Sequence, residues 1–466
     1  MNHLSPNKLQ IPSKPNLIKL AQDIDFFELF KRIEAKYDTC FLLESLGEDS
    51  HISRHHAIGF APAKTIFARD HHTLAITDNH TGETLNYPCD NPYHLLRDIT
   101  PQHVIARNHT GGLVGFMGFD SINFFEPSLT VQSSELFEPF KFGVYLDGLS
   151  FDKMTGEIFY FYYDTPEQSN RMDEIKALLD TPTPNYERPT VAFLGDGMNK
   201  AQHASTVAKV KEDIKAGLIF QCEVGFKSHY HITGDSLPIY AKLREVNPSP
   251  HMYFVKFGEQ KIIGASPELL FRLRNGEMET FPLAGTAKRG KDEAQDRQLA
   301  RALLNDPKEI AEHNMLVDLH RNDIGRVAQF GTVKVRNLMD IKRFSHVQHI
   351  SSEIVGILDP KHDMFTALAS NFPAGTLSGA PKIEAIKIIN ELEPDGRGAY
   401  GGALGQFSFN GDCIFAIPIR SLFMKGEQAY AQTCGGNVYD SNAEDEYEEI
   451  VRKLSAMKVV LSNFMD

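Results

Sequence analysis

The sequence predicts an α+β fold, in which antiparallel strands come first and helices alternate with strands later. Before residue 180, apolar and aromatic runs such as TCFLLES, KTIFARD and GEIFYFYYD are separated by turn residues, as is typical of antiparallel strands. Helical spacing over 203–217 is followed by the strand-like LIFQCEVGF, and long helices are predicted over 307–319 and 444–464. The proline-rich DTPTPNYERPT interrupts every period. We therefore divide the chain into an N-terminal region, 1–185, and a C-terminal region, 190–466.

Composition restricts the classes of partner. The 466 residues are 42% hydrophobic and 23% charged, which is typical of a globular protein with a large core. A net charge of -13 argues against nucleic acid or an anionic membrane as the main partner. The five cysteines form no C-x-x-C motif, and the chain contains neither a signal peptide nor a long apolar run. We expect a cytoplasmic protein with no nucleic-acid or membrane partner.

The loop FPAGTLSGAP, residues 372–381, directly precedes the amphipathic KIEAIKIINELE. Gly375 and Gly379 would let the backbone approach a ligand, and the N-terminus of the following helix would attract an anion. An ordinary turn before a helix that begins at Pro381 is the alternative. Because G-x-x-x-x-G-K-[ST] and G-x-G-x-x-G are both missing, a small carboxylate is favoured over a nucleotide.

Two of the expected helices each carry a pair of glutamates three residues apart. Glu309 and Glu312 share one helix face, and Glu446 and Glu449 share another. If the helices meet, four carboxylates would form a hard-oxygen site that suits Mg²⁺. Considered alone, Glu309 equally suits a capping box with Asp306, and acidic helix faces are commonly solvated.

Several segments resemble, in order and spacing, the chorismate-utilising enzymes. These segments are PLAGTAKRG (282–290), DPKEIAEHNMLVDLHRNDIGRV (306–327), FPAGTLSGAPK, GAYGGALGQF (398–407), IPIRS (417–421) and DSNAEDEYEEIVRKL. Several long motifs in the right order are far more specific than a short one. The resemblance implies two face-to-face antiparallel β-sheets with helices packed outside, and a cleft that binds chorismate and Mg²⁺.

The resemblance also implies roles for single residues. Glu312 and Glu449 would be Mg²⁺ ligands, supported by Glu309 and Glu446 directly or through water. The catalytic set would be Glu268 as general acid, His349 in the elimination of pyruvate, Gln221 and Thr376. The residues implied in substrate binding are Gly285, Thr286, Gly375, Gly379, Tyr400, Arg420, Gly435, Gly436 and Lys453. Without the resemblance, His349 would be taken as a structural histidine and Lys453 as an ion-pair partner of Glu449.

Gln221 bears on the choice between reactions of the family. Members that add water carry a lysine base at this position, and a glutamine cannot take a proton from water, whereas ammonia is already a nucleophile. The resemblance therefore favours amination, either to anthranilate with release of pyruvate or to aminodeoxychorismate. Many members of the second kind carry a nucleophilic lysine where this chain has Ala284. Anthranilate is the favoured product, and aminodeoxychorismate stays the alternative.

The supply of ammonia and the expected feedback regulation each imply a binding partner. The chain has no G-x-C-x-G elbow with a downstream histidine, so a separate glutamine amidotransferase subunit and a hetero-oligomer are expected. LLES (42–45) and NPSPHMYF (247–254) resemble the family's tryptophan-feedback pocket. The implied inhibitor contacts are Glu44, Ser45, Pro250, Met252 and Tyr253. His251 replaces a usual aromatic residue of that pocket, which argues against the inhibitor contacts more than against the catalytic residues. Cys434 replaces a usual glycine near the substrate, which makes a catalytically silent tryptophan-binding or scaffold subunit a further alternative.

Overall fold

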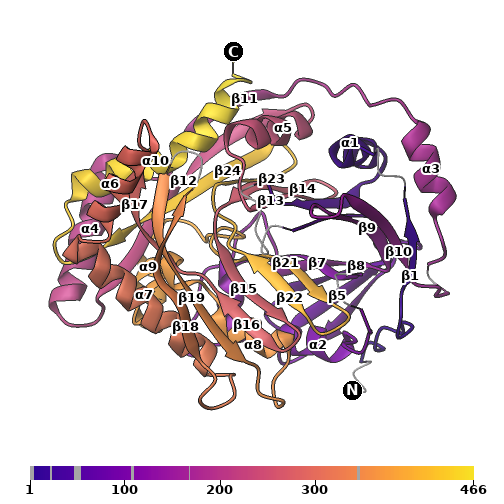
Figure 1. Ribbon diagram of the computed structural model, residues 1–466, viewed down its shortest axis with the longest axis horizontal. Coiled ribbons are helices and arrows are strands. Elements are labelled where there is room, and N and C mark those ends of the chain that lie inside the picture. The colour runs from indigo at the N-terminus through magenta and orange to yellow at the C-terminus, as the bar shows by residue number, and fades with distance from the viewer. Residues whose placement is uncertain are drawn as a thin grey trace.

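The computed structural model describes residues 5–20, 24–46, 54–106, 110–166, 168–343 and 347–465. Within these residues, two large antiparallel sheets face one another and helices cover their outer surfaces (Figure 1). This arrangement confirms the expected fold. The segment 181–189 contains no helix or strand, and strands from both sides of it enter both sheets.

The first sheet follows the order β1 (Asn16–Lys19), β10 (Glu157–Tyr162), β9 (Asp147–Asp152), β3 (His55–Phe60), β2 (Thr39–Glu44), β13 (His251–Phe257), β14 (Gln260–Ser266), β23 (Ser421–Lys425), β24 (Gln428–Asn437), β12 (Gln221–Thr233) and β11 (Thr190–Asp196), with β20 (Gly379–Ala380) paired to β12. The second sheet follows the order β17 (Leu283–Lys288), β19 (Val347–Ile357), β16 (Glu277–Thr280), β15 (Leu269–Arg274), β22 (Cys413–Ala416), β21 (Ala403–Ser408), β7 (Gly112–Met117), β8 (Phe140–Tyr145), β4 (Lys64–Asp70), β5 (Thr73–Asp78) and β6 (Thr84–Pro88), with β18 (Lys334–Arg343) paired to β19.

Helices cover the sheets. They are α1 (Phe26–Lys36), α2 (Pro92–Ile99), α3 (Met172–Asp180), α4 (Lys200–Lys215), α5 (Leu237–Val246), α6 (Glu293–Leu303), α7 (Pro307–Gly325), α8 (Met364–Asn371), α9 (Lys382–Leu392) and α10 (Ala443–Ser462), together with the 3₁₀ turns η1 (Phe119–Phe124) and η2 (Gly375–Leu377). In Figure 1, α4, α6, α7 and α10 gather on one side of the molecule, and α1 and α3 lie on the other. None of the helices in the described part of the chain combines the length and apolar character needed to cross a bilayer.

Strand β13 shows why the first sheet is apolar on both faces. Its odd-numbered residues Tyr253 and Val255 join the core between the sheets, whereas Met252 and Phe254 pack toward the helices outside. Successive side chains of a strand point to opposite faces. Because both faces are covered, HMYFVKF is a nearly continuous apolar run, and its pairing with β2 joins the N-terminal and C-terminal regions in one sheet.

Candidate active site

The glycines of the loop 372–381 make room for neighbouring protein groups. Strand β20 pairs with β12, and a Cβ atom at Gly379 would collide with the carbonyl oxygen of Gln221. A Cβ atom at Gly375 would collide with Leu319 of α7. Helix α9 begins after Pro381, which is its N-cap. The two glycines therefore allow close packing of the loop against β12 and α7, and their contact with a substrate stays a prediction.

A buried ion pair fastens this loop to the first sheet. Arg397 donates to the carbonyl oxygens of Leu377, at 2.6 Å, and Glu223, at 2.7 Å, and its guanidinium pairs with Glu393 at 2.7 Å. Glu393 in turn accepts a hydrogen bond from the backbone N–H of Gly225 at 3.0 Å. The side chains of Arg397 and Glu393 are only 2% and 3% exposed, so water does not compete for these bonds. Neither residue was among the site residues predicted from the sequence.

Glu268 lies on the connection between β14 and β15 and is buried. The hydroxyl of Thr376 donates to its Oε1 atom at 2.8 Å. Burial raises the pKa of Glu268 to about 8 against the opposing effect of this hydrogen bond, because a carboxylate is poorly solvated there. The carboxyl group is therefore mostly protonated at neutral pH, as a general acid requires.

His349 lies on β19 opposite Thr286 of β17. Its Nδ1 atom is 2.8 Å from the carbonyl oxygen of Gly285 and 3.1 Å from the hydroxyl of Thr286. Burial lowers the pKa of His349, so the imidazole is neutral at physiological pH. Because a carbonyl oxygen only accepts, the Nδ1–H group donates to Gly285, and Nε2 carries the lone pair of a base.

The glutamates of the expected metal site interact electrostatically through Glu449, which adds to the effect of burial in raising the pKa of each of the other three. Glu309 and Glu312 lie on α7, and Glu446 and Glu449 lie on α10. Burial, together with the nearby carboxylates of Glu223, Glu309 and Glu449, raises the pKa of Glu312 to about 7. Mutual repulsion of this kind is what a divalent cation would relieve, and the donors are the hard oxygens that Mg²⁺ accepts.

These carboxylates do not form a ready coordination sphere. Glu449 pairs with Lys453 Nζ at 2.8 Å, and Glu446 accepts a hydrogen bond from the Ser441 hydroxyl at 2.7 Å. Glu309 faces Gly285, where an added Cβ atom would lie 2.8 Å from its Oε2 atom. Among the described residues, no three His, Cys, Asp or Glu side chains are close enough together to hold a metal ion. The donor set fits Mg²⁺ in charge and chemistry, and side-chain movement is needed to bind it.

Cys434 of β24 connects three of the residues expected to bind substrate. Tyr400 OH donates to the Cys434 sulfur at 3.2 Å, and Lys453 Nζ donates to its carbonyl oxygen at 3.0 Å. The guanidinium of Arg420 donates to the carbonyl oxygen of Lys453 at 2.5 Å. The cysteine therefore occupies space next to the tyrosine, in place of the glycine that the resemblance leads one to expect. Lys453 forms both the ion pair and a contact to the strand.

Gln221 lies on β12, and Gly435 and Gly436 lie on the paired strand β24, together with Glu223 of β12, which was not among the predicted site residues. Glu223 is opposite Gly436 in the strand pairing and is only 6% exposed. Its Oε1 atom accepts a hydrogen bond from Gln221 Nε2 at 2.9 Å. Burial raises the pKa of Glu223. A glutamate inside the apolar run LIFQCEVGF was visible in the sequence and would have indicated a buried polar site.

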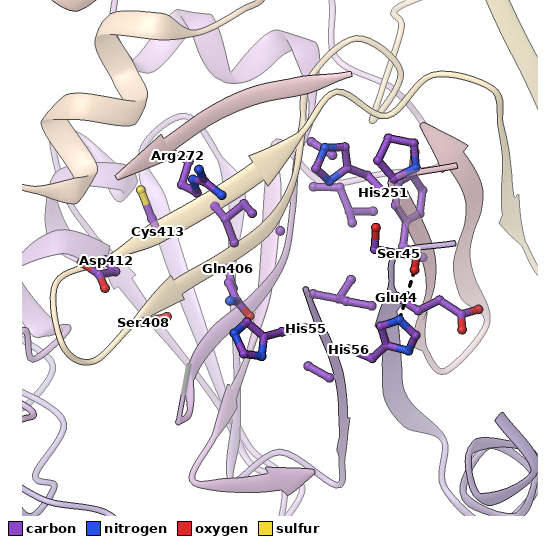
Figure 2. A pocket seen from close by; sticks show the side chains of 18 of the residues that line it. Glu44, Ser45, His55, His56, His251, Arg272, Gln406, Ser408, Asp412 and Cys413 are labelled. Carbon is purple, nitrogen blue, oxygen red and sulfur yellow. Dashed lines mark hydrogen bonds between the residues drawn. The ribbon is translucent and has the colours of Figure 1, made fainter. Parts of the chain in front are cut away.

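A cavity of about 180 Å³ lies between the two sheets (Figure 2). The five residues expected to contact an inhibitor all line it, on β2, β13 and the turn before β13. These residues are Glu44, Ser45, Pro250, Met252 and Tyr253. The opposite wall comes from β15, β21 and β22. The structure thus brings two segments about 200 residues apart into one cavity, through the pairing of β2 with β13.

Some polar groups that line this cavity have hydrogen-bond partners in the protein, and others do not. The carboxylate of Glu44 accepts from Tyr240 OH and from Arg244 Nε, each at 2.6 Å, so it is already paired. In contrast, the hydroxyl of Ser45 and both ring nitrogens of His55 are buried with no partner among the described residues. Burial lowers the pKa of His251 to about 4, which leaves this lining residue neutral. Unpaired buried polar atoms are rare in folded proteins, and here they indicate room for a polar ligand.

Comparisons with known proteins agree with these features. A family model described as "chorismate binding enzyme" matches residues 38–459. The chain is 51% identical to anthranilate synthase component 1 of Leptospira biflexa, with 97% of each chain covered. It is 42% identical to anthranilate synthase component 1 of Methanothermobacter thermautotrophicus, with 92% of this chain and 91% of the relative covered.

Two solved structures are similar to this fold. The crystal structure of anthranilate synthase component I from Streptococcus pneumoniae has a TM-score of 0.77 and 33% identity, over 88% of this chain and 93% of that chain. The isochorismate synthase MenF from Escherichia coli has a TM-score of 0.73 over 97% of this chain and 96% of that chain. At 19% identity, MenF supports the fold alone.

Proposed function

Because the chain belongs to the chorismate-binding enzyme family, we propose that it converts chorismate and ammonia into anthranilate, pyruvate and water. The observation that carries this proposal is the buried carboxyl group of Glu268, whose pKa of about 8 keeps it protonated at neutral pH. The relatives named anthranilate synthase component 1 support the choice of product. Their designation as a first component supports a second subunit, which would be a glutamine amidotransferase that supplies ammonia.

The first chemical step needs a proton donor. When the nitrogen lone pair of ammonia attacks C2 of the chorismate ring, the two ring double bonds shift and the C4–O bond breaks. A hydroxide ion is a poor leaving group, so the carboxyl group of Glu268 gives a proton to this oxygen, which departs as water. The ammonium group formed at C2 releases one proton to solvent and becomes the amine. The Thr376 hydroxyl holds Oε1 of that carboxyl group. Gln221 contributes no base, which suits a nucleophile that carries its own lone pair.

The second step needs a base. Removal of the C2 proton forms the aromatic ring as the enolpyruvyl group leaves C3, and protonation of that group yields pyruvate. The neutral imidazole of His349 is suited to take the proton, because the Nδ1 contact with Gly285 fixes the tautomer and leaves the lone pair on Nε2. Tyr400 and Arg420 are proposed to bind the enolpyruvyl carboxylate.

Mg²⁺ is proposed as the cofactor. Glu312 and Glu449, with Glu309 and Glu446, would hold the ion, which when bound would neutralise the ring carboxylate and stabilise developing charge. Glu312→Ala and Glu449→Ala are each expected to weaken Mg²⁺ binding by at least about 10- to 100-fold, the scale known for residues around metal sites. Calorimetric titration with Mg²⁺ and turnover at limiting Mg²⁺ measure this loss.

Glu444→Ala is the matched control for the metal variants. Glu444 lies in the first turn of the same helix, α10, but its side chain is 69% exposed and pairs with Lys200. This variant should bind Mg²⁺ like the wild type. Full activity of both Glu312→Ala and Glu449→Ala at limiting Mg²⁺ would contradict the metal assignment.

Tryptophan is proposed to inhibit the enzyme by binding in the cavity between the sheets. Tyr253 supports a connection between this cavity and the substrate site, since its hydroxyl lies 2.6 Å from Ser421 Oγ and 3.5 Å from the Ile419 carbonyl oxygen, on either side of Arg420. Occupancy would inhibit if the ligand binds the inactive arrangement of this segment more tightly.

Ser45→Ala is expected to raise the tryptophan concentration for half-inhibition about three- to tenfold, the range of one hydrogen bond. The Ser45 hydroxyl is buried and unpaired within the described structure, so a ligand would be its partner. Activity without tryptophan should stay unchanged, and the thermal stabilisation by tryptophan should shrink. Inhibition equal to that of the wild type would remove Ser45 from the proposed contacts.

The reaction is tested with the purified chain, chorismate, MgCl₂ and an ammonium salt. Anthranilate fluorescence and pyruvate should appear in equal amounts. Consumption of chorismate without pyruvate would instead indicate aminodeoxychorismate. Binding of tryptophan without any consumption of chorismate would indicate a silent subunit.

A further inference from the structure

Glu223 is the buried acidic group of the site that the proposed reaction leaves without a role. We propose that Glu223 is a positioning residue, which orients the amide of Gln221 so that its carbonyl oxygen binds an N–H group of the incoming ammonia. This inference rests on the proposed function, because it assigns the ammonia subsite of the same reaction. Neither the match to the family nor the motifs of the sequence assign a role to Glu223.

The two side chains lie on the same face of β12, because residues two apart in a strand point the same way. Gln221 Nε2 donates to Glu223 Oε1 at 2.9 Å, so the donor end of the amide is fixed by the carboxylate. The other end, Gln221 Oε1, is buried and has no partner among the described residues. A buried acceptor is normally paired, and this one is therefore available to a ligand with an N–H group.

The carboxylate of Glu223 is itself held in place. The Cys434 thiol lies 3.4 Å from its Oε2 atom, and the backbone of Glu223 bonds to Ser378 at 2.9 Å and to Arg397 at 2.7 Å. Gly436 lies opposite, where an added Cβ atom would be 2.5 Å from Glu223 Oε1 and 2.7 Å from Gln221 Nε2. The absence of a side chain at position 436 leaves room for the hydrogen-bonded pair.

Ammonia matches this arrangement. The molecule has three N–H donors and one lone pair, so an acceptor oxygen binds it through N–H and leaves the lone pair for attack on carbon. An amide whose NH₂ group is engaged by a carboxylate presents only this oxygen. Rotation of the Gln221 amide by half a turn would present an N–H group instead, and that group would donate to the lone pair of ammonia and withhold it from attack on carbon. Glu223 prevents this rotation.

The test compares Glu223→Leu with Glu223→Gln in steady-state assays with chorismate, Mg²⁺ and varied ammonium, expressed as free ammonia. Leucine cannot hold the Gln221 amide, and the KM for ammonia should rise about tenfold, the effect of one lost buried hydrogen bond. The KM for chorismate should stay within about twofold, because substrate is anchored elsewhere. Glutamine at 223 accepts the same bond through its amide oxygen, and its KM for ammonia should stay within about threefold of the wild-type value.

Two further variants distinguish a specific effect on the Gln221–Glu223 pair from a general defect in folding. Gly436→Ala displaces the pair without removing it and should also raise the KM for ammonia. Glu34→Gln removes the charge of another glutamate that is 6% exposed, paired with Lys256, and should leave both KM values unchanged. Thermal unfolding of all variants identifies any that do not fold.

Three results would overturn the inference. These are an unchanged KM for ammonia in both Glu223→Leu and Gly436→Ala, an equal rise in the KM for chorismate, and a loss in Glu223→Gln as large as that in Glu223→Leu. The third result would show that the charge of Glu223 matters, as for a base or a metal ligand. Failure of the wild type to form anthranilate would refute the proposed function instead.

Discussion

Glu268→Gln is expected to lower kcat about 100- to 10,000-fold, the usual contribution of a general acid. Glutamine keeps the shape of the side chain and an oxygen that accepts the bond from Thr376, but it has no proton to give to the departing hydroxyl. The variant should still bind chorismate, because it loses the proton that Glu268 transfers but keeps the side-chain oxygen that accepts the bond from Thr376. Rates measured under saturating chorismate and ammonium, with chorismate binding followed separately, make this distinction.

The pH dependence of the wild type provides a second measurement. Since Glu268 acts in its protonated form and its pKa is about 8, kcat/KM should fall as pH rises through about 8. The folded-state pKa also lies above the value of 4.5 for an unperturbed glutamate. Folding therefore takes up a proton between these values, and this group costs stability as pH rises through that window. Glu268→Gln escapes that cost, so its Tm at pH 8 should be no lower than that of the wild type.

A Glu268→Gln variant with near wild-type kcat would contradict the assignment of the acid. Glu279→Gln is a useful comparison, since Glu279 is also a buried glutamate but pairs with Arg272 in the second sheet, away from Thr376. Its substitution should affect stability and leave the alkaline limb of the pH profile unchanged.

Arg397→Met is expected to lower the free energy of unfolding by about 3–5 kcal/mol, the cost of leaving one buried charge without its partner. The variant leaves the Glu393 carboxylate, which is 3% exposed, without its ion-pair partner, and it removes the hydrogen bonds to the carbonyl oxygens of Leu377 and Glu223. Urea unfolding, with the slope compared between proteins, measures the loss. Turnover should also fall, because Arg397 joins the loop that carries Thr376 to strand β12.

Arg336→Met is the matched control for this prediction. Arg336 pairs with Glu277 at 2.8 Å, but the two side chains are 45% and 33% exposed, and such a surface pair contributes only about 0–1 kcal/mol. In the double variant Arg397→Met with Glu393→Gln, part of the stability should return because no buried charge is left unpaired. Equal losses in Arg397→Met and Arg336→Met would show that burial of the pair has no special effect.

Local patterns in the sequence were sufficient to predict the parts of the site that lie within a single helix or strand. The spacing of Glu309 and Glu312, and of Glu446 and Glu449, follows from helix geometry alone, and both helices are present. The same helix geometry indicated the ion pair between Glu449 and Lys453, which the structure contains. Gly285 lies next to Glu309 only because β17 packs against α7, whereas the bond from Ser441 to Glu446 joins residues five apart in the chain.

Glu223 and Arg397 are two residues whose importance could not be predicted from local patterns in the sequence. Each belongs to a segment that was examined for another reason, the strand LIFQCEVGF and the region before GAYGGALGQF. Their importance lies in partners 211 and 174 residues away, namely Cys434 for the Glu223 carboxylate and the Glu223 backbone for Arg397. Contacts across such separations are set by sheet order, which local periodicity does not encode.

The sequence by itself determined which residues carry chemistry and which segments are helices or strands, because side-chain type and apolar spacing are local properties. Only the tertiary structure decided the ionisation of Glu268, the orientation of the Gln221 amide and the shared cavity of LLES with NPSPHMYF. The physical reason is that a pKa and a hydrogen bond depend on burial and on neighbours. The ionisation of Glu268 and the hydrogen bond of the Gln221 amide both depend on the exclusion of water by the two sheets and by the helices packed outside them.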